Sequence, residues 1–125
     1  MKKRATTIWE HWDGIMENGA FWSTDMNSFN HYAYGSVIDW IYEKAAGIRH
    51  EENAPGFSCA VIAPLPDRRL GWLEAELATR NGRIRSKWSY VGDSVRYEIN
   101  TEVPAAVRIG DTEREVNPGS YVFWG

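Results

Sequence analysis

The chain has 125 residues, of which 43% are hydrophobic and 25% charged, as in a soluble globular protein. Its net charge of −3 gives no basis for nucleic-acid binding, and no apolar run reaches membrane-spanning length. The single cysteine, Cys59, excludes an internal disulfide, and no His/Cys cluster has metal-ligand spacing. We therefore expect no nucleic-acid or membrane partner, no metal and no other cofactor.

Residues 5–27 carry Gly14, Asn18 and Gly19 among aromatic residues, a pattern that predicts an ordered loop rather than a helix. The preceding start, Met1–Arg4, is basic, but no apolar core follows it, so a signal peptide is not expected within the chain.

Residues 28–46 are predicted to form one long helix. Phe29, Val37 and Ala45 belong to a set of apolar residues at three- and four-residue spacing, with Ser28 or Asn27 as the N-cap and Gly47 closing the helix. Because the opposite face is also apolar, the helix should be buried by other elements. A chain this short offers few of them, which indicates that a partner is missing.

From residue 56 onward the sequence predicts short strands separated by turns. Alternating residues such as Val95, Tyr97 and Ile99, and the hairpin signal Asn81-Gly82, are typical of an antiparallel β-sandwich. Basic residues between Arg68 and Arg96 alternate with apolar ones and fit the solvated face of a strand. The predicted fold is α+β, mainly β: an N-terminal loop and one long apolar helix (about 28–46), then an antiparallel β-sandwich.

Candidate catalytic residues lie near the N-terminus. Glu10 stands between Trp9 and Trp12, and a partly desolvated carboxylate of this kind suits general acid–base catalysis. His31 opens the predicted helix and is the most plausible hydrogen-bonding partner for a polar ligand. Indole rings stack well on sugar faces.

Two blocks carry a resemblance to a known family. The first is Ala5-Thr6-Thr7-Ile8-Trp9-Glu10 with Trp12-Asp13-Gly14, and the second is Met26-Asn27-Ser28-Phe29-Asn30-His31-Tyr32-Ala33-Tyr34-Gly35. They resemble the end of the catalytic domain of bacterial α-L-rhamnosidases (glycoside hydrolase family 78), and Ala54-Pro55-Gly56-Phe57 resembles the segment that leaves its (α/α)6 barrel. Arg4 departs from the pattern, in which a small residue is expected before the first block.

The resemblance implies that residues 1–50 are the C-terminal remnant of the barrel and residues 51–125 a C-terminal β-sandwich domain. It implies an inverting α-L-rhamnosidase in which Glu10 is the general base, His31 binds rhamnose, and Trp9 and Trp12 shape or support the site. Inversion needs a second carboxylic acid, which in the family lies far upstream. The chain alone is therefore expected to be inactive, as the C-terminal part of a larger enzyme that acts on rhamnose-containing glycosides or polysaccharides.

Two alternatives stay open. The sandwich is a carbohydrate-binding module if exposed Trp72, Trp88 or Trp124 grips a glycan. It is purely structural if it only braces the barrel, in which case the apolar helix 28–46 should drive self-association of the isolated chain.

Overall fold

The computed structural model describes residues 6–125, so the basic start Met1–Arg4 and Ala5, the first residue of the first block, lie outside the described residues. The chain divides into two compact units: one ends at Asp39, and the other runs from Trp40 to Gly125. The proposed domain division at residues 50 and 51 stays a prediction. No helix within residues 6–125 has both the length and the apolar character needed to cross a membrane.

The first unit is a loop that leads into helix α1 (Tyr32–Trp40). An isolated bridge joins Ile15 to Phe21, and Gly19 between them takes a positive φ of 83°. The loop predicted for residues 5–27 is therefore present over its described part, and it is ordered by turns and backbone hydrogen bonds.

Helix α1 is shorter than the predicted helix 28–46. It has 9 residues, and a π-helical turn of 5 residues, Ile41–Ala45, follows it directly. The backbone groups of Ser28 and His31 are instead hydrogen-bonded to residues 8 and 10, and that pairing delays the helix until Tyr32. Ser28 and Asn27 are thus not the N-cap, whereas Gly47 has a φ of 75° and follows the C-cap Ala46, as predicted.

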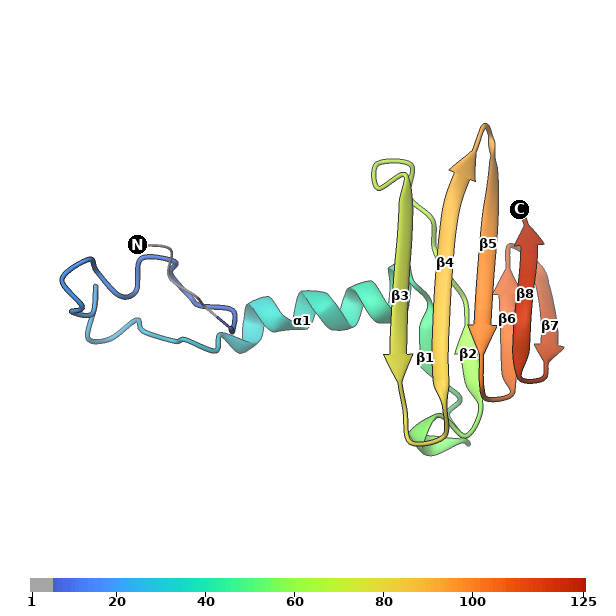
Figure 1. Ribbon diagram of the computed structural model, residues 1–125, viewed down its shortest axis with the longest axis horizontal. Helices are drawn as coiled ribbons and strands as arrows, with labels where there is room; N and C mark the ends of the chain where they lie inside the picture. The colour runs from blue at the N-terminus through green and yellow to red at the C-terminus, as the bar shows by residue number, and fades with distance from the viewer. Residues whose placement is uncertain (1–5) are drawn as a thin grey trace. The chain divides into compact units, whose positions relative to one another are not determined.

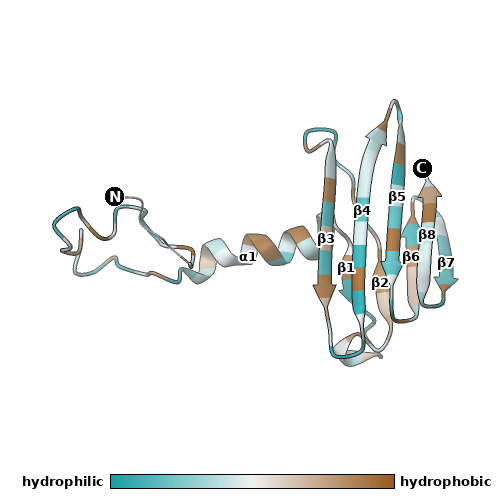
Figure 2. Ribbon diagram, in the orientation of Figure 1, coloured by the Kyte–Doolittle hydropathy of each residue, from teal (hydrophilic) through white to brown (hydrophobic). Residues whose placement is uncertain are grey.

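None of the residues of α1 is buried, although the helix carries three aromatic residues and a hydrophobic stretch that is brown in Figure 2. Its exposed large side chains are Tyr32, Tyr34, Val37, Ile38 and Trp40. The described residues, 6–125, therefore do not provide the burial that the sequence predicts for this helix.

The second unit is a sandwich of two four-stranded sheets (Figure 1). In chain order its strands are β1 (Ile48–His50), β2 (Ala60–Ile62), β3 (Trp72–Ala78), β4 (Arg83–Val91), β5 (Ser94–Thr101), β6 (Ala105–Ile109), β7 (Thr112–Val116) and β8 (Gly119–Trp124), with a 3-10 turn at Pro55–Phe57. One sheet has the order β1-β2-β6-β7 and the other β3-β4-β5-β8.

The mainly β fold with two sheets agrees with the sequence-based expectation, except that one strand pair is parallel. Strand β6 runs parallel to β2, with Ala60 opposite Ala105 and Ile62 opposite Val107. The intervening strands β3, β4 and β5 belong to the other sheet, so the chain returns to the first sheet by a crossover rather than a hairpin.

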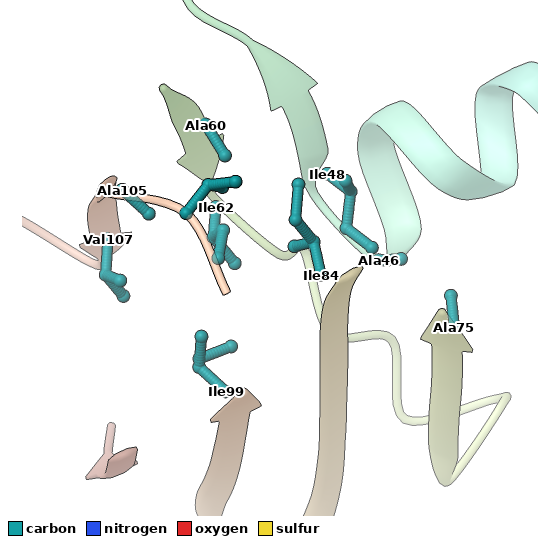
Figure 3. Close-up of a cluster of buried hydrophobic side chains, with 10 residues drawn as sticks. Ala46, Ile48, Ala60, Ile62, Ala75, Ile84, Ile99, Ala105 and Val107 are labelled. Carbon is teal, nitrogen blue, oxygen red and sulfur yellow. The ribbon is translucent and has the colours of Figure 1, made fainter. Parts of the chain in front are cut away.

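The core lies between the two sheets (Figure 3). Ile48, Ile62 and Val107 come from one sheet, and Ile84 and Ile99 come from the other. Along β4 and β5 every second residue is buried, which is the period expected when one face of a sheet is covered. The basic residues of β4 occupy the other face, as predicted.

Trp88 and Ser86 fix the end of the helical segment to this core. The Trp88 indole Nε1 donates a 2.7 Å hydrogen bond to the Ala45 carbonyl, and Ser86 Oγ donates one of 2.7 Å to the Ala46 carbonyl. Carbonyls at a helix C-terminus lack intrahelical partners, so both bonds satisfy groups that burial would otherwise penalise. Trp88 is fully buried, and its proposed role as an exposed glycan contact is therefore wrong.

Candidate functional site

Two segments that are far apart in the sequence are hydrogen-bonded to each other in the first unit. The backbone N–H of Glu10 donates to the Ser28 carbonyl at 2.8 Å, and that of His31 donates to the Ile8 carbonyl at 2.7 Å. The Thr7 hydroxyl also donates to the Phe29 carbonyl. This pairing brings the two sequence blocks together and places Glu10 beside His31.

The Glu10 carboxylate has two neighbours. Its Oε2 accepts a 3.2 Å hydrogen bond from the Ser28 backbone N–H, and its Oε1 lies 3.7 Å from His31 Nε2. The Glu10 side chain is 19% exposed and that of His31 is 25% exposed. The carboxylate is thus oriented by the backbone yet still reaches solvent.

His31 can form a further hydrogen bond through its second ring nitrogen. Its Nδ1 is buried and has no hydrogen-bond partner among the described residues. Leaving a buried polar atom unpaired costs about 1–3 kcal/mol, so such an atom is a place for a ligand or water to bind. An adjacent hollow of about 270 Å³ is lined by His31, Ile8, Asn30 and Asp39, among others.

Trp9 and Trp12 have different surroundings. Trp9 is half-buried and packs edge-to-face on Phe29, with ring centroids 4.9 Å apart. Trp12 is 70% exposed and lines a separate open hollow of about 970 Å³ together with Asp13 and Trp22. The structure therefore brings Glu10 and His31 together, packs Trp9 on Phe29, and puts Trp12 on another hollow.

Two contributors were not identified from the sequence. Tyr34 lies against His31 in a tilted arrangement, with ring centroids 4.6 Å apart and an interplanar angle of 30°. Their spacing of three residues within the predicted helix 28–46 was an available signal for this contact. The Ser28 N–H that holds Glu10 had no such signal, because any residue except proline supplies that donor.

Comparisons with known proteins identify the family of this chain. A model of the bacterial alpha-L-rhamnosidase 6 hairpin glycosidase domain matches residues 1–45, and a model of the bacterial alpha-L-rhamnosidase C-terminal domain matches residues 47–117. The second match alone covers more than half of the chain. The chain belongs to the bacterial α-L-rhamnosidase family. Glu10 and His31 lie in the part that matches the glycosidase domain.

The individual proteins to which the chain is similar are alpha-L-rhamnosidases. An alpha-L-rhamnosidase of Streptomyces avermitilis is 42% identical over 86 residues, which are 69% of this chain and 8% of that protein. One from an Alteromonas species is 36% identical over 100 residues, or 80% of this chain and 10% of that protein. The chain thus spans about a tenth of the length of these rhamnosidases.

Solved structures match nearly the whole chain. The Streptomyces avermitilis alpha-L-rhamnosidase complexed with L-rhamnose gives a TM-score of 0.72 at 31% identity, covering 97% of this chain and 14% of that one. The alpha-L-rhamnosidase of Aspergillus terreus gives a TM-score of 0.74 at 28% identity, with coverages of 96% and 14%.

Proposed function

We propose that this chain contributes the general base, Glu10, to an inverting α-L-rhamnosidase that hydrolyses terminal α-L-rhamnosides. The observation that carries the proposal is the Glu10 carboxylate, held by the Ser28 N–H beside His31 within the region that matches the glycosidase domain. The L-rhamnose complex of the Streptomyces relative supports rhamnose as the sugar.

In this proposal Glu10 removes a proton from a water molecule that attacks the anomeric carbon on the face opposite the leaving group. A general acid, whose carboxyl group lies roughly 6.5–9.5 Å from that of the base in inverting glycosidases, must protonate the departing oxygen. We place that acid in the remainder of the glycosidase domain, outside this chain. The chain by itself should then bind sugar weakly and release none, because half of the acid–base pair is missing.

The other candidate residues take supporting roles. His31 holds a sugar hydroxyl through a ring nitrogen, and its Nδ1, which has no hydrogen-bond partner within residues 6–125, supports this role. Trp9 packs behind the base through Phe29. Trp12, exposed in its own hollow, shapes the approach of the substrate.

We further propose that residues 1–50 complete the catalytic barrel of the parent enzyme and that residues 51–125 brace it. The exposed apolar side chains of α1 would then pack against the missing barrel helices, and in the isolated chain they would drive self-association. Sedimentation velocity tests this: association that weakens in a Val37→Ser/Ile38→Ser double variant is expected, and a strictly monomeric chain would contradict it.

Titration of the 125-residue chain with L-rhamnose, followed by tryptophan fluorescence, tests the sugar site. A saturable change is expected in the unaltered chain and in His50→Ala, a matched control on β1, but not in His31→Ala. If His31→Ala responds like the unaltered chain, His31 does not hold the sugar.

An activity assay tests the catalytic role. The chain should release no nitrophenol from an aryl α-L-rhamnoside, and Glu10→Gln in the full-length enzyme should lower kcat by several orders of magnitude with KM little changed. Turnover by the 125-residue chain that Glu10→Gln abolishes would overturn the assignment of the acid to the missing part.

A further inference from the structure

The outer face of sheet β3-β4-β5-β8 carries a cross-strand row of four residues with a tryptophan at each end. The strand register places Trp72 opposite Ser89, Ser89 opposite Arg96, and Arg96 opposite Trp124. Partners in a register point to the same face of a sheet. Trp72 is 64% exposed and Trp124 is 58% exposed, while their neighbours Leu73 and Phe123 pack into the core.

The spacing of the two indoles suits an extended ligand. Three strand intervals of about 4.8 Å separate β3 from β8, so the two tryptophan backbones stand ~14 Å apart. That span exceeds one pyranose ring and matches a short oligosaccharide lying across the strands. Indole faces stack on the apolar faces of sugars.

Between and beside the tryptophans the face is polar and its charges are paired with each other. Lys87 Nζ lies 3.1 Å from Glu98 Oε1, and Arg85 Nη2 lies 2.8 Å from Glu74 Oε1. Arg96 also pairs with Glu98. Glu98 is shared by two cations, so these five groups carry a net charge of +1, and each of them has a partner within the sheet. The face therefore offers donors and acceptors without requiring an ionic ligand.

A hollow of about 260 Å³ lies on the same face, between β4, β5 and β8. It is lined by the polar side chains of Arg85, Glu98, Asn100 and Ser120, with Val122 as an apolar contact. The Asn100 amide donates a 2.7 Å hydrogen bond to Ser120 Oγ, which leaves the amide oxygen free to accept from a ligand hydroxyl. The volume is close to the lower end of small-ligand sites.

We propose that this face is a glycan-binding surface that holds a neutral, rhamnose-containing oligosaccharide, stacked on Trp72 and Trp124 and hydrogen-bonded along the row between them. The choice of rhamnose rests on the proposed function, whereas the surface itself is independent of Glu10 and His31. A protein partner fits less well, because charged residues are depleted from the cores of protein interfaces, and here Arg96 lies in the row between the indoles with Lys87 and Glu98 in the adjacent row.

Calorimetric titration of the chain with α-linked rhamno-oligosaccharides of one to six units tests the proposal. Affinity should rise with length until the row is spanned and then level off. Trp72→Ala and Trp124→Ala should each weaken binding at least tenfold, and Trp72→Phe and Trp124→Phe should retain most of it. Leu65→Ala, which removes an exposed apolar side chain outside the sheet, is the matched control and should bind normally.

Glu10→Gln and His31→Ala separate this proposal from the catalytic one. Both variants should keep the length-dependent binding even if they lose the response to free L-rhamnose. Binding that is equal for one and six units, or that survives both tryptophan-to-alanine changes, would overturn the glycan surface and leave the proposal for Glu10 untouched. A Trp72→Ala variant that loses only association with the rest of the parent enzyme would show a protein interface instead.

Discussion

The N-terminal unit and the sandwich are built from the same kinds of residues, yet they use them in opposite ways. In the sandwich, aliphatic and aromatic side chains from both sheets meet in a continuous core, and Trp88 is completely buried. In the unit ending at Asp39, Gly14 is the only described residue that is buried, while Trp12, Phe21 and Trp22 are exposed. The sandwich buries most of its large apolar side chains in its own core, whereas the N-terminal unit leaves many of its own exposed.

This contrast shows what holds each part together. The N-terminal unit is kept in shape by backbone hydrogen bonds that join residues 8 and 10 to residues 31 and 28, and by a few aromatic pairs. Such bonds stabilise by about 0.5–1.5 kcal/mol each. The sandwich adds hydrophobic burial, which is the dominant favourable contribution to folding.

The largest effect is expected for Trp88→Ala. It creates a cavity in the sandwich core and leaves the Ala45 carbonyl without its donor, so we expect a loss of about 4 kcal/mol in the free energy of unfolding. Urea denaturation, monitored by circular dichroism, measures this change in the free energy of unfolding. The exposed Trp72→Ala is the control and should change stability by about 0.5 kcal/mol at most. Equal effects of the two changes would mean that the core does not depend on Trp88.

Gly47→Ala should come next. Gly47 has a φ of 75°, and an added Cβ would lie 2.1 Å from the backbone carbon of Ala63, so both strain and a clash oppose the change. We expect a loss of about 3 kcal/mol. Gly92→Ala separates the two causes, because Gly92 also has a positive φ but an added Cβ meets nothing within 4 Å. Gly92→Ala should lower the free energy of unfolding by about 1 kcal/mol. A loss as large as that of Gly47→Ala would mean that the clash with Ala63 does not contribute.

Phe29→Ala tests whether the two units are stabilised separately. It removes the edge-to-face pair with Trp9 and the contact with Phe21, at about 0.5–1.5 kcal/mol for such a pair. Hydrogen exchange of the Glu10 and His31 amides should become faster, while the urea midpoint of the sandwich stays the same. A matching shift of that midpoint would show that the units unfold together.

The smallest effect concerns pH. The Arg69 side chain donates hydrogen bonds to the Asp67 carboxylate and lowers its pKa to about 2. A lowered pKa in the folded state stabilises the protein above the unfolded value of about 3.9, and this contribution is lost as the pH falls through 2. Asp67→Asn should therefore reduce the acid-induced fall in the urea midpoint between pH 4 and pH 2 slightly. The difference should shrink in 1 M salt, because the pair is exposed.

Much of the sandwich could be predicted because its signals are local. Alternation along β4 and β5, the Asn81-Gly82 hairpin and the positive φ of Gly47 each depend on a few neighbouring residues. The start of the helix could not be found this way. Periodicity extended it back to residue 28, but backbone pairing with residues 8 and 10 competed for the groups that the extra turn would need.

The candidate site likewise has features that the sequence predicted and features that it did not. The sequence by itself identified Glu10 and His31 as residue types in a recognisable pattern, and it determined that this chain is a part of the α-L-rhamnosidase family with strands in its second half. Only the tertiary structure decided that the Ser28 N–H holds the Glu10 carboxylate, that Trp88 is a core donor, and that Trp72 and Trp124 share one row. The sequence specifies the type of each side chain directly. The burial of a side chain and its neighbours depend instead on which distant backbone segments pair, and this pairing is determined by the packing of the whole unit.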